Sequence, residues 1–479
     1  MTKTLTQGNP AKLIFFFAMP LIIGNIFQQF YSMADTLIVG RTIGVNALAA
    51  VGCTGSITFF ILGFVNGLTS GLSIITAQKF GSGNEHAVRK RFAAGILISV
   101  AAGIIFTILA VFLARPLLEL LQTPDEIIED AYSYLVIIFM GIPATILFNL
   151  LSNIVRALGD SKTPLYFLIF ACLVNIVLDF VFILNFHMGV AGAGVATILA
   201  QLLSGILCIV FIVKKVPLLW VKKEDFRIHP EIILSHLGVA LPMAFQMSII
   251  AIGSLMLQFA LNGLGSVSVA AYTASQKIDS IATFPMNSFG TAMATYAAQN
   301  YGAGKFNRIR KGVFQCILIS GSFSILMGFV NIFAGSQLTS LFVGAGETEV
   351  LALSQTYLTI NGCMYPVLAL LFIYRFTLQG IGKSLFPTVA GVMELIMRAI
   401  GALILTGLFG FAGACASNPL AWIGACIPLA AAYYASMRKL PKQDFEDNTQ
   451  YTLPEQKSSI LMTMRRRRRL WNPGISSTE

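Results

Sequence analysis

The chain has 479 residues, of which 56% are hydrophobic and only 11% are charged. Soluble domains carry about 25% charged residues, so the composition excludes an ordinary soluble protein and favours one embedded in a lipid bilayer. The net charge of +11 is spread over short connections between apolar runs and over the tail. That distribution is typical of membrane topology and not of a nucleic-acid-binding face, so no nucleic acid partner is expected.

Twelve apolar runs are long enough to cross a bilayer, because a spanning helix needs about 20 residues. In chain order they occupy residues 13–39, 47–78, 93–114, 131–155, 163–184, 190–213, 233–261, 266–298, 312–334, 356–380, 386–410 and 411–436. The sequence therefore predicts an all-α integral membrane protein with twelve transmembrane helices.

The distribution of lysine and arginine predicts how these helices are oriented. Basic residues follow the even-numbered runs, whereas the odd-numbered connections carry few of them alongside acidic residues. Because basic connections stay on the cytoplasmic side, we expect both termini in the cytoplasm. We expect no cleavable signal and a multi-pass protein of the bacterial inner membrane.

Three short segments recur at an offset of 221 to 223 residues, which equals six helices and so keeps both halves in one orientation. The matches are Ala18-Met-Pro20 with Ala240-Leu-Pro242, Gln78-Lys-Phe-Gly-Ser-Gly83 with Gln299-Asn-Tyr-Gly-Ala-Gly304, and Gly159, Lys162 and Pro164 with Gly380, Lys383 and Pro387. They predict two parallel, pseudo-symmetric six-helix lobes, a plan in which substrate binds between the halves.

The lobes are predicted at residues 1–213 and 233–436, joined by a cytoplasmic linker at 214–232. Residues 437–479 are predicted to form a disordered, polybasic cytoplasmic tail. Its Arg465–Arg469 run is interpreted as solvated charge or, alternatively, as a segment attracted to anionic lipid headgroups.

Polar groups inside apolar runs are costly and are therefore candidates for function. Asp35, Asn175, Asp179 and Thr197 all fall in the outer half of the first six spans, and Asn175 and Asp179 share one helix face. Two carboxylates, an amide oxygen and a hydroxyl suit a small hard cation such as Na⁺. Buried carboxylates can alternatively carry protons, and a third interpretation is a hydrogen-bonded cluster that only joins helices.

The second half offers a different set. Glu394 and Arg398 are spaced i, i+4 and are interpreted first as a structural pair and second as cavity lining. Lys277 and Asp279 point about 200° apart on an ideal helix. Either one of them faces the central cavity, or the two form pairs within the second half.

Motifs for other activities are missing from the sequence. It contains no phosphate-binding loop, zinc-helix motif or serine-elbow motif, so we expect neither an ATP-driven pump nor an enzyme. We expect no cofactor beyond a coupling ion, Na⁺ or H⁺.

Over about residues 8–436 the sequence resembles the multidrug and toxic compound extrusion (MATE) family. The motifs that carry the resemblance are Gln28-Gln-Phe-Tyr-Ser-Met-Ala-Asp-Thr-Leu-Ile-Val-Gly40, the duplicated Gln-x-x-Gly-x-Gly, Asn175-Ile-Val-Leu-Asp179 and Arg156-Ala-Leu-Gly-Asp-Ser-Lys-Thr-Pro164.

The resemblance implies two lobes around a V-shaped cavity and alternating access driven by Na⁺ or H⁺. It also implies a cation site at Asp35, Asn175, Asp179 and Thr197. A subfamily with an acidic residue on the seventh helix is a poorer match, because this helix carries Gln246 and no acid.

We therefore predict a cation-coupled antiporter that exports small, often cationic or amphipathic organic compounds. The expected partners are drug-like small molecules and membrane lipids, and the expected state is a monomer. The alternative is a flippase for lipid-linked precursors, which would need a strongly cationic central cavity.

Overall fold

The computed structural model describes residues 4–344 and 346–445, most of which are helical. The α-helices are α1 (Pro10–Thr42), α2 (Val45–Gly81), α3 (Glu85–Leu120), α4 (Asp125–Met140), α5 (Ile142–Ala157), α6 (Lys162–Phe180), α7 (Gly189–Lys215), α8 (Pro230–Asn262), α9 (Ser266–Gly302), α10 (Phe306–Val343), α11 (Thr348–Gly380), α12 (Leu385–Ile400) and α13 (Thr406–Arg438). Short π-helical turns follow α6 (η1, Val181–Asn185) and α12 (η4, Gly401–Leu405), and 3₁₀ turns lie between α7 and α8 (η2, Pro217–Leu219; η3, Lys223–Phe226).

Nine helical stretches of the described residues are long and apolar enough to cross a membrane, or ten if the bent pair α4 and α5 is counted as one span. The helix α9 and the division of Leu385–Arg438 add two, which gives the twelve spans that the sequence predicts. The pair α4 and α5 is one span that bends by 45° around Gly141. The continuous stretch Leu385–Arg438 is two spans, because the backbone of Gly410 leaves the helical region (φ 56°, ψ −133°). The break falls where the eleventh and twelfth apolar runs meet.

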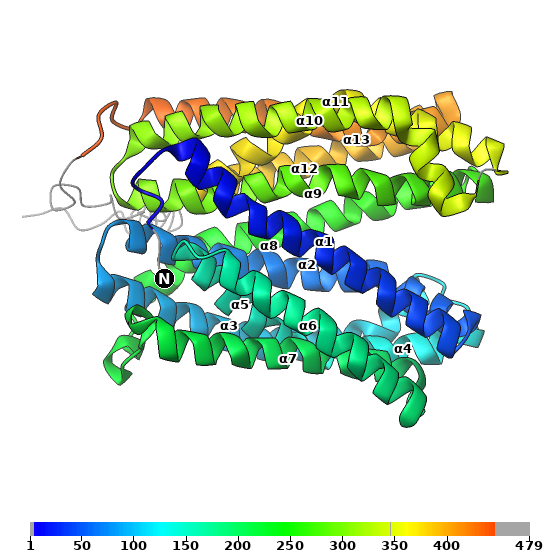
Figure 1. Cartoon of the computed structure of the whole chain (residues 1–479), viewed down its shortest axis with the longest axis horizontal. Helices are drawn as coiled ribbons and strands as arrows, with labels where there is room; N and C mark the ends of the chain where they lie inside the picture. Colours follow the sequence, from blue (N-terminus) through cyan, green and yellow to red (C-terminus); the bar gives the residue numbers. More distant parts are fainter. Residues whose placement is uncertain (1–3, 345, 446–479) are drawn as a thin grey trace, which may run out of the picture.

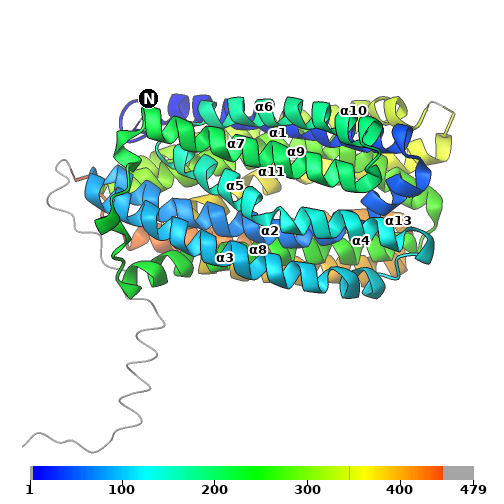
Figure 2. The same cartoon turned by 90° about the horizontal axis from the view of Figure 1, so that it is seen from below.

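The helices run along one long axis in two layers (Figures 1 and 2). Helices α9–α13 lie in one layer and α3–α7 in the other, with α2 and α8 between them and α1 crossing obliquely (Figure 1). Helices α2 and α8 pack backbone to backbone, since a Cβ atom on Gly67 or Gly71 would overlap the α8 backbone at Met243 or Ala240. Glycine thus allows the two halves to approach closely.

Both ends of the described chain lie at the same end of the bundle (Figure 1), as an even number of spans requires. We call this the basic end. It carries the connections α2–α3, α5–α6, α7–α8, α9–α10 and α11–α12, where the sequence places most of its basic residues.

Pairs of glycines in the left-handed region show how the halves correspond. Gly44 and Gly265 (φ 126° and 93°) each precede a helix, and Gly83 and Gly304 (φ 73° and 70°) each follow one. The third pair corrects the repeat read from the sequence. The equivalent of Gly159 (φ 88°) is Gly382 (φ 80°) and not Gly380.

Because of this shift of two residues, Lys383 stands opposite Asp160 and not Lys162, while Pro164 and Pro387 still correspond. Matching by residue type alone could not place the shift, because both halves have several glycines and lysines nearby.

Segments outside the spans pack against the basic end. Leu5 and Thr6 are buried, and the Leu5 carbonyl accepts a hydrogen bond from Asn300. After α13, Asp444 accepts a hydrogen bond from the Asn307 backbone. The Arg465–Arg469 run lies outside the described residues.

Candidate functional site

A cluster of oxygen atoms lies where α1, α6 and α7 meet, and the four residues singled out in the first half belong to it. The carboxyl groups of Asp35 and Asp179 are within hydrogen-bonding reach of each other. In the orientation that satisfies both ends of its amide, Asn175 donates to Asp179 Oδ2 at 2.9 Å and accepts from the Thr197 backbone nitrogen at 3.1 Å. Asp179 and Asn175 are buried.

Two carboxylate oxygens in this cluster accept no hydrogen bond from a protein donor. Asp35 Oδ1 and Asp179 Oδ1 are both buried without a hydrogen bond. Leaving a charged acceptor unsatisfied is costly, and two adjacent carboxylates repel each other unless a positive charge lies between them. Hard oxygen ligands of this kind fit a small cation such as Na⁺, and the carboxyl pair would equally hold a shared proton.

Within residues 4–344 and 346–445, no group of three or more His, Cys, Asp or Glu side chains could hold a metal ion. The candidate site therefore has only two charged ligands, and its remaining oxygens are neutral.

Sequence reasoning missed Tyr31, whose hydroxyl lies 3.1 Å from Thr197 Oγ1. Its position four residues before Asp35 on α1 was the available signal. A polar cavity of about 150 Å³ adjoins the cluster. Its polar lining residues are Gln28, Tyr31, Asn66, Thr145, Asn149, Asn175, Thr197 and Gln201.

In the second half, the predicted Glu394–Arg398 pair is part of a buried triad. Glu394 Oε2 lies 2.5 Å from Arg375 Nη2, and Glu394 Oε1 lies 3.0 Å from Arg398 Nη2. Arg375 comes from the neighbouring helix α11 and was not expected as a partner. Three nitrogens, Arg375 Nε and Arg398 Nε and Nη1, are buried without a hydrogen bond.

Gln246 is also buried within the second half. It accepts a hydrogen bond from Gln379 at 2.8 Å, so it joins α8 to α11.

Asp279 and Lys277 point in different directions, as their spacing predicts. Asp279 accepts a hydrogen bond of 2.7 Å from Tyr365, whose hydroxyl accepts one of 2.6 Å from Asn331. Lys277 is exposed, and it forms none of the ion pairs found in the described part of the chain. Lys277 lies about 17 Å along α9, at a depth where a charged side chain is costly unless it reaches water or a partner.

The duplicated glutamine motif closes the basic end. Gln78 donates to the Gly380 carbonyl in the second half at 2.8 Å, and Gln299 donates to the Ala157 carbonyl in the first half at 2.8 Å. A Cβ atom on Gly81 would overlap the Gln299 carbonyl, and one on Gly302 would overlap the Gln78 carbonyl. The repeat thus builds a symmetric contact between the halves.

We expect Gly302→Ala to hold the halves apart at the basic end, because the added methyl group meets backbone that cannot yield. Spin labels at Lys90 and Lys311, one in each half, should report a longer distance than in the unsubstituted protein. Gly321→Ala is the matched control, since no atom of another residue lies within 4 Å of its added Cβ. An unchanged distance distribution in Gly302→Ala would contradict the proposed contact.

Comparison with known proteins places this chain among membrane transporters. The MatE family profile matches residues 20–181 and 242–404, one match in each half. The "Probable multidrug resistance protein YpnP" of Bacillus subtilis is 31% identical over 380 residues, covering 79% of this chain and 84% of that protein. The "Multidrug export protein MepA" of Staphylococcus saprophyticus is 22% identical, covering 83% and 87% of the two chains.

The fold agrees with solved structures. The outward-facing structure of a "multidrug resistance MATE family transporter of the MOP superfamily" superposes with a TM-score of 0.85 at 22% identity, covering 92% of this chain and 98% of that one. The chain therefore belongs to the MatE family, and it is a multi-pass membrane transporter and not an enzyme.

Proposed function

We propose that this protein is an antiporter that exports small organic compounds in exchange for a cation bound at Asp35 and Asp179. The observation that carries the proposal is the adjacent carboxyl pair with two unpartnered oxygens at Asp35 and Asp179. The names of the relatives, which describe multidrug resistance and export, support drug-like substrates.

The coupling follows from differential affinity. A ligand shifts a conformational equilibrium only if it binds one state better than the other. The cation stabilises the arrangement in which α1 and α6 bring Asp35 and Asp179 together, and substrate binding favours the arrangement in which they separate. Breaking and reforming the glutamine contacts at the basic end lets the halves alternate.

The positive-inside pattern supports an orientation with the basic end in the cytoplasm. We further propose that one chain is sufficient for transport, because both halves of the pseudo-symmetric pair are present in it.

The flippase alternative is not favoured. Inside the second half, Arg375 and Arg398 accompany Glu394 and Asp279, so the ionisable groups are mixed in sign. Such mixed charge does not favour the strongly cationic cavity that a flippase would need.

The test is efflux of a cationic dye from proteoliposomes that contain the purified protein, with an imposed Na⁺ gradient or, separately, a pH gradient. We expect one of the two gradients to drive the dye outward and the protein-free vesicles to show no movement. Dye that follows neither gradient, with protein shown to be folded, would reject antiport of this substrate class.

A further inference from the structure

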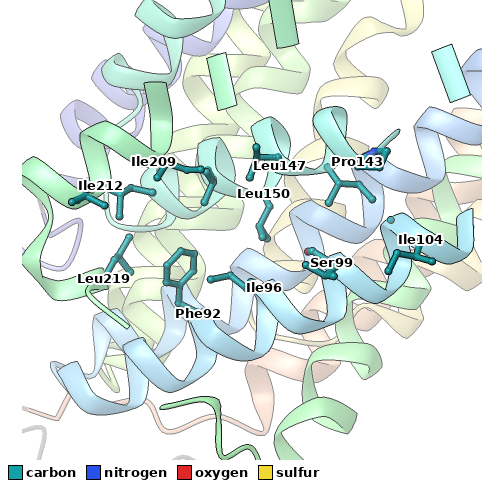
Figure 3. A pocket seen from close by; sticks show the side chains of 15 residues that line it. Phe92, Ile96, Ser99, Ile104, Pro143, Leu147, Leu150, Ile209, Ile212 and Leu219 are labelled. Carbon is teal, nitrogen blue, oxygen red and sulfur yellow. The ribbon is translucent and has the colours of Figure 1, made fainter. Parts of the chain in front are cut away.

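A cavity in the first half is lined by other residues than the one beside the cation cluster. It has a volume of about 460 Å³, within the range of about 300–1,000 Å³ for ligand pockets. Helices α3, α5 and α7 form its walls and η2 closes one end. Figure 3 shows the labelled side chains of α3, from Phe92 to Ile104, facing those of α5 and α7 across the gap.

Helix α5 begins just after the 45° bend at Gly141 and packs on both α3 and α7. Its residues Pro143 and Leu150 line the cavity. The rim residues remain open to the bilayer, since Val100 on α3 is 57% exposed and Val213 on α7 is 55% exposed.

The lining is almost entirely hydrocarbon. Ser99 is the one hydroxyl-bearing residue among the lining residues, and its oxygen has no hydrogen-bond partner. From Phe92 to Ile104 the α3 wall is about 18 Å long at 1.5 Å per residue. The hydrocarbon region of one leaflet is about 15 Å thick, half of the bilayer core, which is close to the length of this wall. The cavity therefore matches an acyl chain in the leaflet at the basic end.

Basic residues closely follow, in the sequence, the lining residues at the end of the cavity that η2 closes. Lys214 and Lys215 directly follow the lining residue Val213, and Lys222 follows the closing turn η2; all three are exposed. Trp220 is 54% exposed, and its indole nitrogen donates to the Val213 carbonyl at 2.9 Å. Tryptophan and lysine at this level are typical of the membrane–water interface.

The nearby acidic residues do not cancel this charge at the cavity. Asp225 is buried and lies 3.9 Å from Arg89. The stretch from Lys214 to Lys223 contains no acidic residue, and Glu224, which follows it directly, is exposed. The linker therefore keeps an excess of positive charge at the surface.

We propose that this cavity is a binding site for an anionic phospholipid. One acyl chain occupies the space between α3, α5 and α7, and the headgroup phosphate contacts Lys214 and Lys215. Thr145 and Asn149 on the other face of α5 line the polar cavity beside Asn175 and Thr197. A bound lipid therefore supports the helix that separates the bilayer from the candidate cation site.

Native mass spectrometry of the purified full chain in detergent, titrated with phosphatidylglycerol or phosphatidylcholine, tests this. We expect one phosphatidylglycerol to be retained in preference to phosphatidylcholine. The double variant Lys214→Gln/Lys215→Gln should lose that preference, because each basic residue near anionic lipid contributes about fivefold. Arg438→Gln/Lys439→Gln, at the corresponding end of α13, is the matched control and should keep it.

A second pair of variants tests the acyl-chain cavity. Gly103→Leu projects into the cavity, where the atoms nearest to an added Cβ are Ile146 Cδ1 at 3.6 Å and Pro143 Cα at 4.0 Å. Binding of both lipids should fall, while the unfolding temperature without lipid stays the same or rises. Ser99→Leu should also fill the cavity and reduce the binding of both lipids. It replaces Gly103→Leu in the test if that variant does not fold.

Three outcomes would overturn the proposal. They are equal retention of the two lipids by the unsubstituted protein, unchanged binding in both cavity-filling variants, and displacement of the lipid by a transported dye. The last outcome would assign the cavity to substrate. None of the three depends on whether transport is cation-coupled.

Discussion

Asp179→Asn is expected to abolish gradient-driven export while the protein remains folded. Asp179 is buried, and its Oδ1 atom lacks a protein partner. A contact to a charged group contributes about 1.5–3 kcal/mol, so losing one of two carboxylates should weaken cation affinity by about tenfold or more. Asp35→Asn should have the same effect.

The measurement is dye efflux from proteoliposomes together with thermal unfolding in detergent. Removing one of two repelling carboxylates should leave the unfolding temperature unchanged or raise it, which distinguishes loss of coupling from misfolding. Asp125→Asn, at an exposed carboxyl in the first turn of α4, is the matched control and should export normally. Normal export by Asp179→Asn would refute the site assignment.

Glu394→Gln is expected to destabilise the second half strongly. The substitution leaves Arg375 and Arg398 buried without the carboxylate that contacts both. Breaking a buried ion pair in this way costs about 3–5 kcal/mol, so the unfolding temperature and the yield of folded protein should both fall. Thermal unfolding in detergent measures the effect.

The triple variant Arg375→Met/Glu394→Leu/Arg398→Met separates structure from function. Replacing all members of a buried ionic group by apolar residues is often neutral or stabilising, so this variant should fold and should still export dye. Glu349→Gln, at an exposed position in the first turn of α11, is the control for a lost carboxylate. A triple variant that folds but cannot export would show that the triad lines the transport pathway.

The four oxygen-bearing residues of the first half could be predicted to lie together because polar residues are rare in these spans. Depth along each helix placed Asp35, Asn175, Asp179 and Thr197 in the outer half of their spans, and the structure brings the four residues together where α1, α6 and α7 meet. Tyr31 was not predicted as a site residue because a tyrosine inside an apolar run is not unusual. Only its hydrogen bond to Thr197 shows that it belongs to the cluster.

Contacts between helices distant in sequence could not be predicted in the same way. Arg375 reaches Glu394 because α11 and α12 are antiparallel neighbours. The i, i+4 spacing within one helix predicts only the pair of Glu394 with Arg398. The glutamine motif was recognised as a repeat, but its role depends on Gln78 and Gln299 each bonding to the other half.

The sequence by itself determined the membrane environment, the number of spans and the duplication. A bilayer requires long apolar helices, and the repeat is visible as similar residues at a constant offset. The tertiary structure alone decided which helix faces meet and how far the third repeat is shifted. It also decided that α4 and α5 bend by 45° at Gly141 and that a hydrocarbon-lined cavity lies beside α5. Helix packing depends on side-chain shape at close approach. The effect of Gly81 and Gly302 becomes clear only when the backbone that packs against each of them is known.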